Sequence, residues 1–380
     1  MGIYLDNAAT TKVKPEVIEA MMPYFTEKFY NPSALYSNAN KIKKDIENAR
    51  KTVGNFINAN SNEIFFTSGG SESNAWAIQG FINYCRRKGK SVSIITSTIE
   101  HKSILNCVDN MNVDVHYVGV DEEGFVNMKS LEALLHDAKN EAHEILVSIQ
   151  YANNECGTIQ HIKEIAEIVH KYNAVFHTDA VQVFGQIPID VKELDIDMLS
   201  ASGHKLGTPK GIGILYKKDS VQIDPLIYGT QMDSMRGGTE NVPYIIGIAK
   251  AVELLQNDKE RQLRLTILRN NFISQLKALG CKVNGSLYER LPNNINVTFF
   301  QDINAENLVY LLDMCEIYIG IGSACNSRSV ETSHVLRAIG LSDEDAMKTI
   351  RITLPDDITM DKIDKAVCNI TKQIMLLTME

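Results

Sequence analysis

The chain has 380 residues, of which 44% are hydrophobic and 22% are charged, enough for one large buried core and a smaller second one. Its net charge of −9 argues against general binding to nucleic acids or to anionic membranes. The start does not resemble a secretory signal, and no run approaches the ~20 apolar residues of a spanning helix, so we expect a cytoplasmic protein without membrane segments.

Seven short apolar runs rich in β-branched residues are typical of strands. They cover residues 63–68, 91–97, 113–120, 144–151, 174–180, 197–202 and 211–216. Longer amphipathic stretches, which predict helices, lie at 72–88, 128–139, 161–172 and 245–279. This alternation predicts an α/β fold, with a large domain at residues 15–250 built around a mainly parallel sheet that helices cover on both faces.

The last third of the chain predicts a smaller α+β domain. Its expected strands are 293–300, 347–354 and 316–329, the last of which enters a polar loop. Its expected helices are 304–313, 334–339 and 360–377. We assign residues 1–14 and 251–380 to this domain, with the helical stretch 245–279 as a bridge between the two domains.

Polar clusters follow five of the predicted strands. They are TSGGSES (67–73), STIEHKS (97–103), YANNECG (151–157), HTDAVQ (177–182) and SASGHK (200–205). Ligands of open α/β sheets bind beyond the carboxyl ends of the strands, in the loops that follow. The five clusters are therefore expected to form one site.

Lys205 is the candidate for covalent chemistry. It follows a buried strand and a glycine, where desolvation would lower the pKa of its amine and make it available for a Schiff base. Lys210, in TPKG, is a rival that lies further from the strand end. A lone lysine in this position would more often be a surface residue of a turn, so the neighbouring clusters decide the interpretation.

Three further side chains suit a flat, electron-withdrawing cofactor. Asp179 could pair with a pyridinium nitrogen, or could simply cap the next helix. Gln182 could hydrogen-bond a phenolic oxygen of the same ring. His101 could stack on the ring and carry a proton, although a histidine at a helix start is the plainer reading.

The segment 68–73, SGGSES, joins a strand to a helix and could bind a phosphate. Its glycines let the backbone approach a ligand, and free N–H groups at a helix start favour an anion. The P-loop pattern GxxxxGK[ST] is absent, so a nucleotide-binding P-loop is not predicted.

The chain has an odd number of widely spaced cysteines and no CxxC pair, so we predict neither a disulfide framework nor a metal site. Cys325 stands out because GIGSACNSRS is rich in small and polar residues, and the nearby Arg328 would favour a thiolate. Arg351 lies within an apolar strand. Its guanidinium could bind a substrate carboxylate or belong to an internal ion pair, and the sequence leaves both open.

Together these segments resemble the NifS/IscS-type cysteine desulfurases, in the class V branch of the fold-type I pyridoxal-phosphate (PLP) enzymes. The resemblance runs nearly the whole chain in one order. It comprises YLDNAATT (4–11), NPSALY (31–36), FFTSGGSES (65–73), TSTIEHKSIL (96–105), NNECG (153–157), HTDAVQ (177–182), SGHKLGTPKGIG (202–213), MRGGTENVP (235–243), NNINVTF (293–299), GSACNS (322–327), HVLRAIGL (334–341) and IRITL (350–354). It implies the fold-type I architecture, a large domain with a seven-stranded sheet and a smaller α+β domain.

The resemblance also implies the cofactor contacts. Lys205 matches the lysine that binds PLP covalently, and Asp179 and Gln182 match the contacts of the ring nitrogen and the phenolic oxygen. His101 matches the histidine that stacks on the ring. The matches to phosphate ligands are Gly70, Ser71, Ser202 and His204. Thr239 matches a phosphate ligand that the second subunit contributes, which implies a homodimer.

The implied reaction converts L-cysteine to L-alanine. Asn154, which also borders the cofactor, and Arg351 match the contacts of the substrate carboxylate. Cys325 matches the cysteine that takes the sulfur as a persulfide. The sulfur would then pass to an acceptor protein for iron–sulfur cluster, thio-cofactor or tRNA synthesis.

Some positions depart from the family pattern. The run Gln231–Arg236 lacks the glutamate and the first arginines that are common there, which could change substrate preference or acceptor access. Cys156 replaces an aliphatic residue in NNECG and is either a packing residue or a second reactive thiol.

Two other functions fit the same motifs. A different PLP activity, such as a lyase or an aminotransferase, would not depend on Cys325. A sulfur-relay or scaffold protein without activity would be free to lose the set Lys205, Asp179 and His101, which this chain retains.

Overall fold

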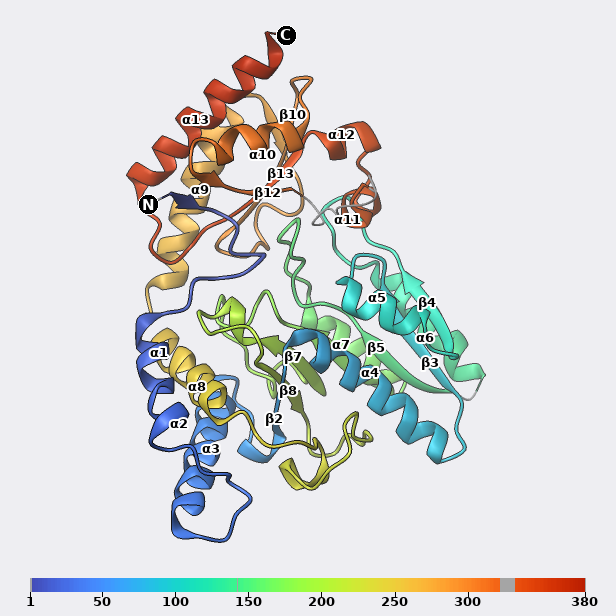
Figure 1. The fold of residues 1–380 in the computed structure, drawn as a ribbon. Helices are drawn as coiled ribbons and strands as arrows, with labels where there is room; N and C mark the ends of the chain where they lie inside the picture. The colour runs from blue at the N-terminus through green and yellow to red at the C-terminus, as the bar shows by residue number, and fades with distance from the viewer. Residues whose placement is uncertain (1, 142, 322–331, 380) are drawn as a thin grey trace.

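The computed structural model describes residues 2–141, 143–321 and 332–379 (Figure 1). Its largest element is a seven-stranded sheet with the order β2-β8-β7-β6-β5-β3-β4. The strands are β2 (Ile64–Thr67), β3 (Val92–Ser97), β4 (Asp114–Val118), β5 (Glu144–Ser148), β6 (Val175–Asp179), β7 (Met198–Ser202) and β8 (Gly213–Lys217). All seven strands predicted from the sequence are present.

Within this large sheet only β8 runs against the other strands. It pairs antiparallel with β2 and β7, whereas successive strands in the run β7-β6-β5-β3-β4 pair in parallel with one another. The predicted mainly parallel sheet is confirmed. β3 and β7 are buried along their whole length, whereas β4 at the edge is partly exposed. Burial on both faces explains why the sequences of the central strands are unbroken apolar runs.

Helices pack on the large sheet and on one another. α4 (Gly70–Arg87) lies across the sheet and contacts six of its strands, and α6 (Met128–Asn140) contacts β3, β4 and β5 and packs against α7 (Ile162–Lys171). α8 (Val242–Asn257) packs against α1 (Pro15–Met21) and α3 (Ser37–Phe56). Two short helices, α2 (Pro23–Thr26) and α5 (Lys102–Asp109), complete this part of the fold.

A second, antiparallel sheet with its own core lies above the large sheet in Figure 1. Its order is β12-β13-β10-β9, with β9 (Cys281–Val283), β10 (Asn294–Phe299), β12 (Gly320–Ile321) and β13 (Thr349–Thr353). The helices beside it are α9 (Arg261–Lys277), α10 (Ala305–Asp313) and α13 (Met360–Thr378). α12 (Asp343–Met347) lies beside the small sheet and contacts β10, and α11 (His334–Ala338) lies between α12 and the large sheet (Figure 1).

The expected helix 245–279 is two helices. α8 ends at Asn257 and α9 begins at Arg261. The three residues between them are all charged and offer nothing to either core, whereas the buried Arg261 is held by an ion pair with Asp356 at 2.6 Å. The division into domains at residue 250 stays a prediction, and that residue lies inside α8.

The N-terminal segment 2–14 joins the two sheets. β1 (Ile3–Tyr4) pairs in parallel with β11 (Ile317–Tyr318), and Asp6 forms a bridge to Thr353 of β13. Further along, Thr11 N–H donates to the carbonyl of His204, just beyond β7. The segment therefore crosses from the small sheet to the loop that carries Lys205. None of the helices in the described part of the chain is long and apolar enough to cross a membrane.

The segment that departs from the family pattern contains a strained turn. Met232, Asp233 and Ser234 have φ angles of 47°, 57° and 64°, in the left-handed region that disfavours residues with a Cβ. The ends of the turn are held from both sides. Gln231 Oε1 accepts the N–H of Gly238 at 3.0 Å, and Arg236 pairs with Glu72 of α4 at 2.9 Å.

Replacing Ser234 by glycine is expected to stabilise the protein by about 0.5–1 kcal/mol, because glycine adopts a positive φ without the steric cost of a Cβ. Ser234 is exposed, so the change removes no buried contact. Ser234→Ala keeps the Cβ and is the matched control. Denaturant unfolding at one protein concentration measures both. An equal gain in the two variants, or a loss in the glycine variant, would show that the turn is not strained.

Candidate active site

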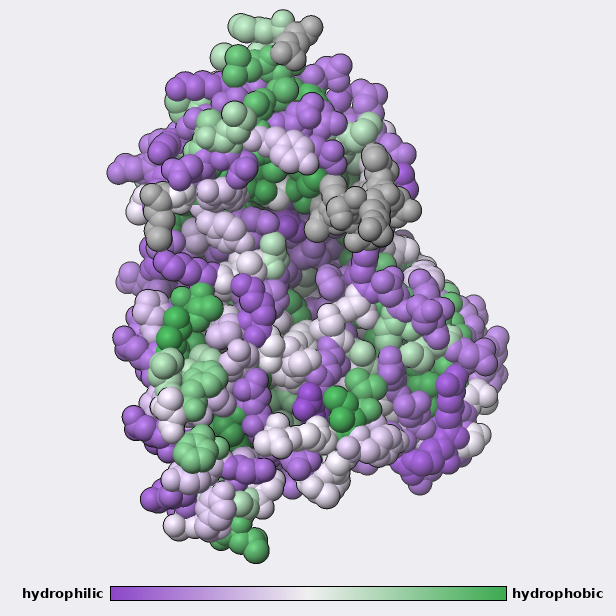
Figure 2. Space-filling view, viewed as in Figure 1, coloured by the Kyte–Doolittle hydropathy of each residue, from purple (hydrophilic) through white to green (hydrophobic). Residues whose placement is uncertain are grey.

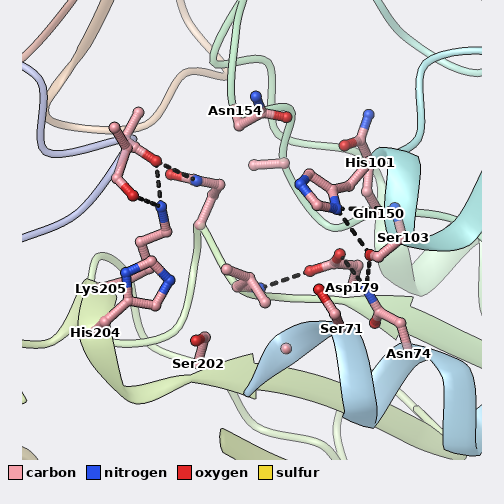
Figure 3. Close-up of a pocket in the computed structure, with 16 residues that line it drawn as sticks. Ser71, Asn74, His101, Ser103, Gln150, Asn154, Asp179, Ser202, His204 and Lys205 are labelled. Atoms are coloured by element: carbon pink, nitrogen blue, oxygen red, sulfur yellow. Dashed lines mark hydrogen bonds between the residues drawn. The ribbon is translucent and has the colours of Figure 1, made fainter. Parts of the chain in front are cut away.

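The loops after β3, β5, β6 and β7 meet at one edge of the large sheet, because these four parallel strands are neighbours. Together with the start of α4 they enclose a pocket of about 220 Å³ (Figure 3). Nine of the residues proposed from the sequence line it. They are Gly70, Ser71, His101, Asn154, Asp179, Gln182, Ser202, His204 and Lys205.

Lys205 lies in a short 3₁₀ turn directly after β7, and its amine donates hydrogen bonds to the carbonyls of Ala8 and, at 2.8 Å, Ala9. Burial lowers the pKa of Lys205 to about 8, assisted by the positive charge of Arg351 and opposed by the carboxylates of Asp6 and Asp179. A much larger fraction of this amine than of an ordinary lysine is therefore uncharged near neutral pH, and the uncharged form is the one that acts as a nucleophile or proton acceptor.

His204 lies beside Lys205 in the pocket wall (Figure 3). Burial, together with the positive charges of Lys205 and Lys210, lowers the pKa of His204 to about 4. Its Nδ1 lies 3.2 Å from the Thr10 hydroxyl, on the N-terminal segment. The neutral imidazole can offer a hydrogen bond to an anion without adding a second cation next to the amine.

A hydrogen-bonded chain links Asp179 to His101 (Figure 3). Asp179 Oδ2 accepts from Asn74 Nδ2 at 2.7 Å, and the same amide group donates to the Ser103 hydroxyl at 3.0 Å. That hydroxyl lies 2.7 Å from His101 Nδ1. The other Asp179 oxygen accepts the N–H of Val181 at 2.9 Å. These hydrogen bonds hold the carboxylate of Asp179 and the imidazole of His101 in place, across the pocket from Lys205.

The same contacts settle the tautomer of His101. Its Nδ1 accepts the backbone N–H of Ser103 at 3.1 Å, so this nitrogen presents a lone pair and the ring proton of the neutral imidazole is on Nε2. His101 is thus the N-cap of α5, as its plainer reading suggested, and it also lines the pocket.

The start of α4 is suited to a phosphate. Gly70 and Ser71 open this 18-residue helix, whose first N–H groups have no partner within the helix. A Cβ at Gly70 would lie 2.6 Å from a methyl group of Val181, so a larger residue would not fit without a shift. Ser71 and Ser202 lie on the same side of the pocket (Figure 3).

This set of groups fits PLP. Lys205 offers the amine for its aldehyde, Asp179 offers a fixed carboxylate for its ring nitrogen, and the start of α4 offers donors for its phosphate. His101 would face the ring and Gln182 its phenolic oxygen. Gln182 Nε2 at present donates to the carbonyl of Ala8 at 3.2 Å.

Two proposed residues lie away from the pocket, and a third falls outside the described residues. Arg351, in the middle of β13, does not line the pocket and forms an ion pair with Asp6 at 2.8 Å. Thr239 is exposed and does not line the pocket. Cys325 lies outside the described residues. Cys156 is fully buried against Val335 and Leu336 of α11, and burial raises the pKa of its thiol, which fits its interpretation as a packing residue.

Sequence reasoning missed several residues of the site. Asn74 and Ser103 have no reactive group, and only the contact with Asp179 and His101 shows what they do. Asn74 does lie one helical turn after Gly70, a spacing that could have indicated it. Ala8 and Ala9 act through backbone carbonyls, which leave no signal in the side chains.

A model of the aminotransferase class-V family matches residues 3–365 of the chain. The chain is 46% identical over 370 residues to the protein named cysteine desulfurase IscS of Methanosarcina thermophila, covering 96% of this chain and 90% of that one. It is 38% identical over 384 residues to the Bacillus subtilis protein named putative cysteine desulfurase IscS 1, covering 99% of each.

Solved structures share the fold. A structure described as a NifS-like protein superposes with a TM-score of 0.91 at 35% identity, covering 99% of this chain and all of the other. A structure described as SspA in complex with cysteine has a TM-score of 0.79 at 36% identity, covering 93% of this chain and 99% of the other.

Proposed function

The chain belongs to the class-V aminotransferase family and, within it, to the cysteine desulfurases, and on that premise we propose that it removes sulfur from L-cysteine, leaves L-alanine and carries the sulfur on Cys325. Enzymes of this family depend on PLP. One observation carries the proposal. The amine of Lys205, with its pKa lowered to about 8, lies in one pocket with Asp179 and His101.

The bound cofactor would supply an electron sink for the negative charge that develops at the α-carbon of the substrate. Asp179 would hold a hydrogen on the ring nitrogen, since its carboxylate is fixed by Asn74 and by the Val181 N–H. Ser71, Ser202, His204 and the first N–H groups of α4 would hold the phosphate.

The chain's own residues would move the protons. Lys205 Nζ would take the proton from the substrate α-carbon, because burial favours its uncharged form. His101, with its proton on Nε2, can donate from that nitrogen into the pocket. Arg351 and Asn154 would hold the substrate carboxylate, and the carbonyl of Asn154 already lies 3.4 Å from Arg351 Nη1.

In the sulfur step the Cys325 thiolate would attack the sulfur of the substrate. A bond forms between the two sulfurs while the carbon–sulfur bond of the substrate breaks. The carbon fragment leaves as alanine after its β-carbon takes a proton and its α-carbon regains the proton that Lys205 removed. One sulfur atom stays on Cys325 as a persulfide, so atoms and electrons balance without an added oxidant. An acceptor protein would then take the sulfur. The candidate uses of this sulfur are iron–sulfur cluster, thio-cofactor and tRNA synthesis.

The purified protein, loaded with PLP and given L-cysteine and a thiol reductant, is expected to release L-alanine and sulfide in equal amounts. Both products are measured over many turnovers. Release of pyruvate and ammonia in place of alanine would identify a lyase and contradict the proposal.

We also propose that the protein is a homodimer in which Thr239 completes the pocket of the second subunit. A group of apolar side chains is exposed around α2 and the following loop: Met22, Phe25, Phe29, Leu35 and Tyr36. Aromatic contacts join several of them, since Phe29 stacks on Tyr30 and Tyr30 meets Tyr36 edge-on. Hydrophobic residues gather on the same lower-left part of the surface in Figure 2. Such a patch favours a covering partner.

The double change Phe29→Asp and Leu35→Asp is expected to give monomers and to weaken PLP binding about tenfold, because it would remove the hydrogen bond of the partner's threonine. Thr239→Ala should weaken PLP binding equally without splitting the dimer. Adding Thr239→Ala to the double variant should not weaken PLP binding further. Sedimentation and PLP titration measure the two properties.

Tyr310→Asp is the matched control, since Tyr310 is an exposed aromatic residue on α10 and its change should leave both properties unaltered. A monomeric wild-type protein, or additive losses of PLP affinity, would contradict the shared pocket.

A further inference from the structure

We propose that Asp6 is a built-in counter-ion for Arg351 that occupies the guanidinium before the substrate arrives and lowers the affinity of the site for carboxylates. The inference rests on the proposed function, in which Arg351 contacts the substrate carboxylate, and it assigns a specificity-determining role to a residue of the N-terminal segment.

The first support is the state of the guanidinium. Arg351 is 6% exposed, in the middle of β13, where a cation needs compensation. Its Nη2 donates to Asp6 Oδ1 at 2.8 Å, and within the described part of the chain its Nη1 has only the long contact of 3.4 Å with the carbonyl of Asn154. Its Nε is buried and has no hydrogen-bond partner among the described residues. The guanidinium of Arg351 therefore makes one short hydrogen bond, to Asp6, and N–H donors remain for the carboxylate of an incoming substrate.

The second support is the placement of Asp6. The N–H of Thr353 donates to the carbonyl of Leu5 at 2.7 Å, so the backbone beside Asp6 is attached to the strand that carries Arg351. The Tyr4 hydroxyl donates to the carbonyl of Asp6 at 3.0 Å. Because both partners of the ion pair belong to one hydrogen-bonded unit, the pair can hold the guanidinium in place before any ligand binds.

The third support is the space around the pair. Position 320, on the neighbouring strand β12, is a glycine that lies opposite Arg351. A Cβ there would come within 2.9 Å of both Arg351 Nη2 and Asp6 Oδ1. The small sheet is therefore shaped to admit this ion pair. Asp6 is also 21% exposed at its side chain, which leaves its carboxylate easier to displace than a buried one.

The ion pair also acts on the pocket electrostatically. The charge of Arg351 lowers the pKa of Lys205 and the charge of Asp6 raises it, so both groups lie close enough to affect the amine. The same closeness means that the negative charge of Asp6 opposes a bound substrate carboxylate, either by competing for the guanidinium or by reducing its net positive charge.

The test compares Asp6→Asn with the wild-type holoenzyme. The asparagine can still accept the hydrogen bond from Arg351 but carries no charge. We expect L-alanine, the product, to bind about three- to tenfold more tightly to the variant, while L-alaninamide, which lacks the carboxylate, binds equally to both proteins. Calorimetry or the cofactor absorbance measures the binding. The absorbance titration of the lysine-bound cofactor should also move to lower pH, because a negative charge near Lys205 is removed.

An equal change for L-alanine and L-alaninamide, or no change for either, would overturn the role of Asp6 and leave the proposed function intact. Arg351→Ala is the reference, since it should remove the preference for L-alanine over the amide, and Asp6→Asn should then have no further effect. A wild-type holoenzyme that binds neither ligand would overturn the proposed function together with the role of Asp6.

Discussion

Lys205→Ala is expected to lower alanine formation from L-cysteine by about 10³-fold or more, because it removes both the covalent anchor of the cofactor and the group proposed to move the α-proton. The variant should still bind PLP through Asp179 and the start of α4, but borohydride should no longer link the cofactor to the chain. Product analysis and mass spectrometry after borohydride treatment measure the two effects.

Lys210→Ala is the matched control, since Lys210 belongs to the same loop and was the rival in the sequence. It does not line the pocket, so its loss should leave the cofactor bound and the activity nearly unchanged. The reverse result, with borohydride linking PLP to Lys210, would refute the assignment.

The lowered pKa of Lys205 adds a pH dependence to this prediction. Below about pH 8 the amine is mainly protonated and cannot attack an aldehyde, so the rate of PLP uptake by the cofactor-free protein should rise with pH and level off above that value. A rate that keeps rising toward the ordinary lysine pKa near 10.4 would contradict the burial of the amine.

Cys325→Ala is expected to lower the formation of both alanine and sulfide by about 10²-fold or more, because no thiolate would remain to take the sulfur. Cofactor binding should be unchanged, and L-cysteine should still alter the cofactor absorbance, since neither property depends on this thiol. This separation distinguishes a lost sulfur step from a misfolded protein.

Cys368→Ala is the control for the sulfur step. Cys368 is exposed on α13 and has no proposed role, so activity should be retained. Full activity in Cys325→Ala would contradict the persulfide route and favour a lyase.

The sequence predicted the site well where function depends on side-chain chemistry at strand ends. Lys205 and His101 each follow a predicted strand and Asp179 lies at the end of one. The parallel order β7-β6-β5-β3 brings those strand ends together, as the alternation of elements implied. The unbroken apolar runs located these strands because central strands of a parallel sheet are buried on both faces.

The parts that the sequence did not predict depend on long-range contacts. The break between α8 and α9 is invisible to helical periodicity, since the buried Arg261 is held by contacts far away in the chain, with Asp356, 95 residues later, and with the carbonyl of Gly185. For Arg351 the sequence left two readings open, and the structure shows an ion pair with Asp6, which is 345 residues away in the chain. The substrate role of Arg351 remains a proposal that this ion pair does not exclude.

The most direct test of the central claim is a single turnover with L-cysteine in the absence of a reductant or an acceptor. We predict one alanine per subunit and a mass increase of one sulfur atom on the peptide that carries Cys325, with no increase on peptides carrying the other cysteines. Alanine and free sulfide formed without any sulfur on Cys325 would contradict the account.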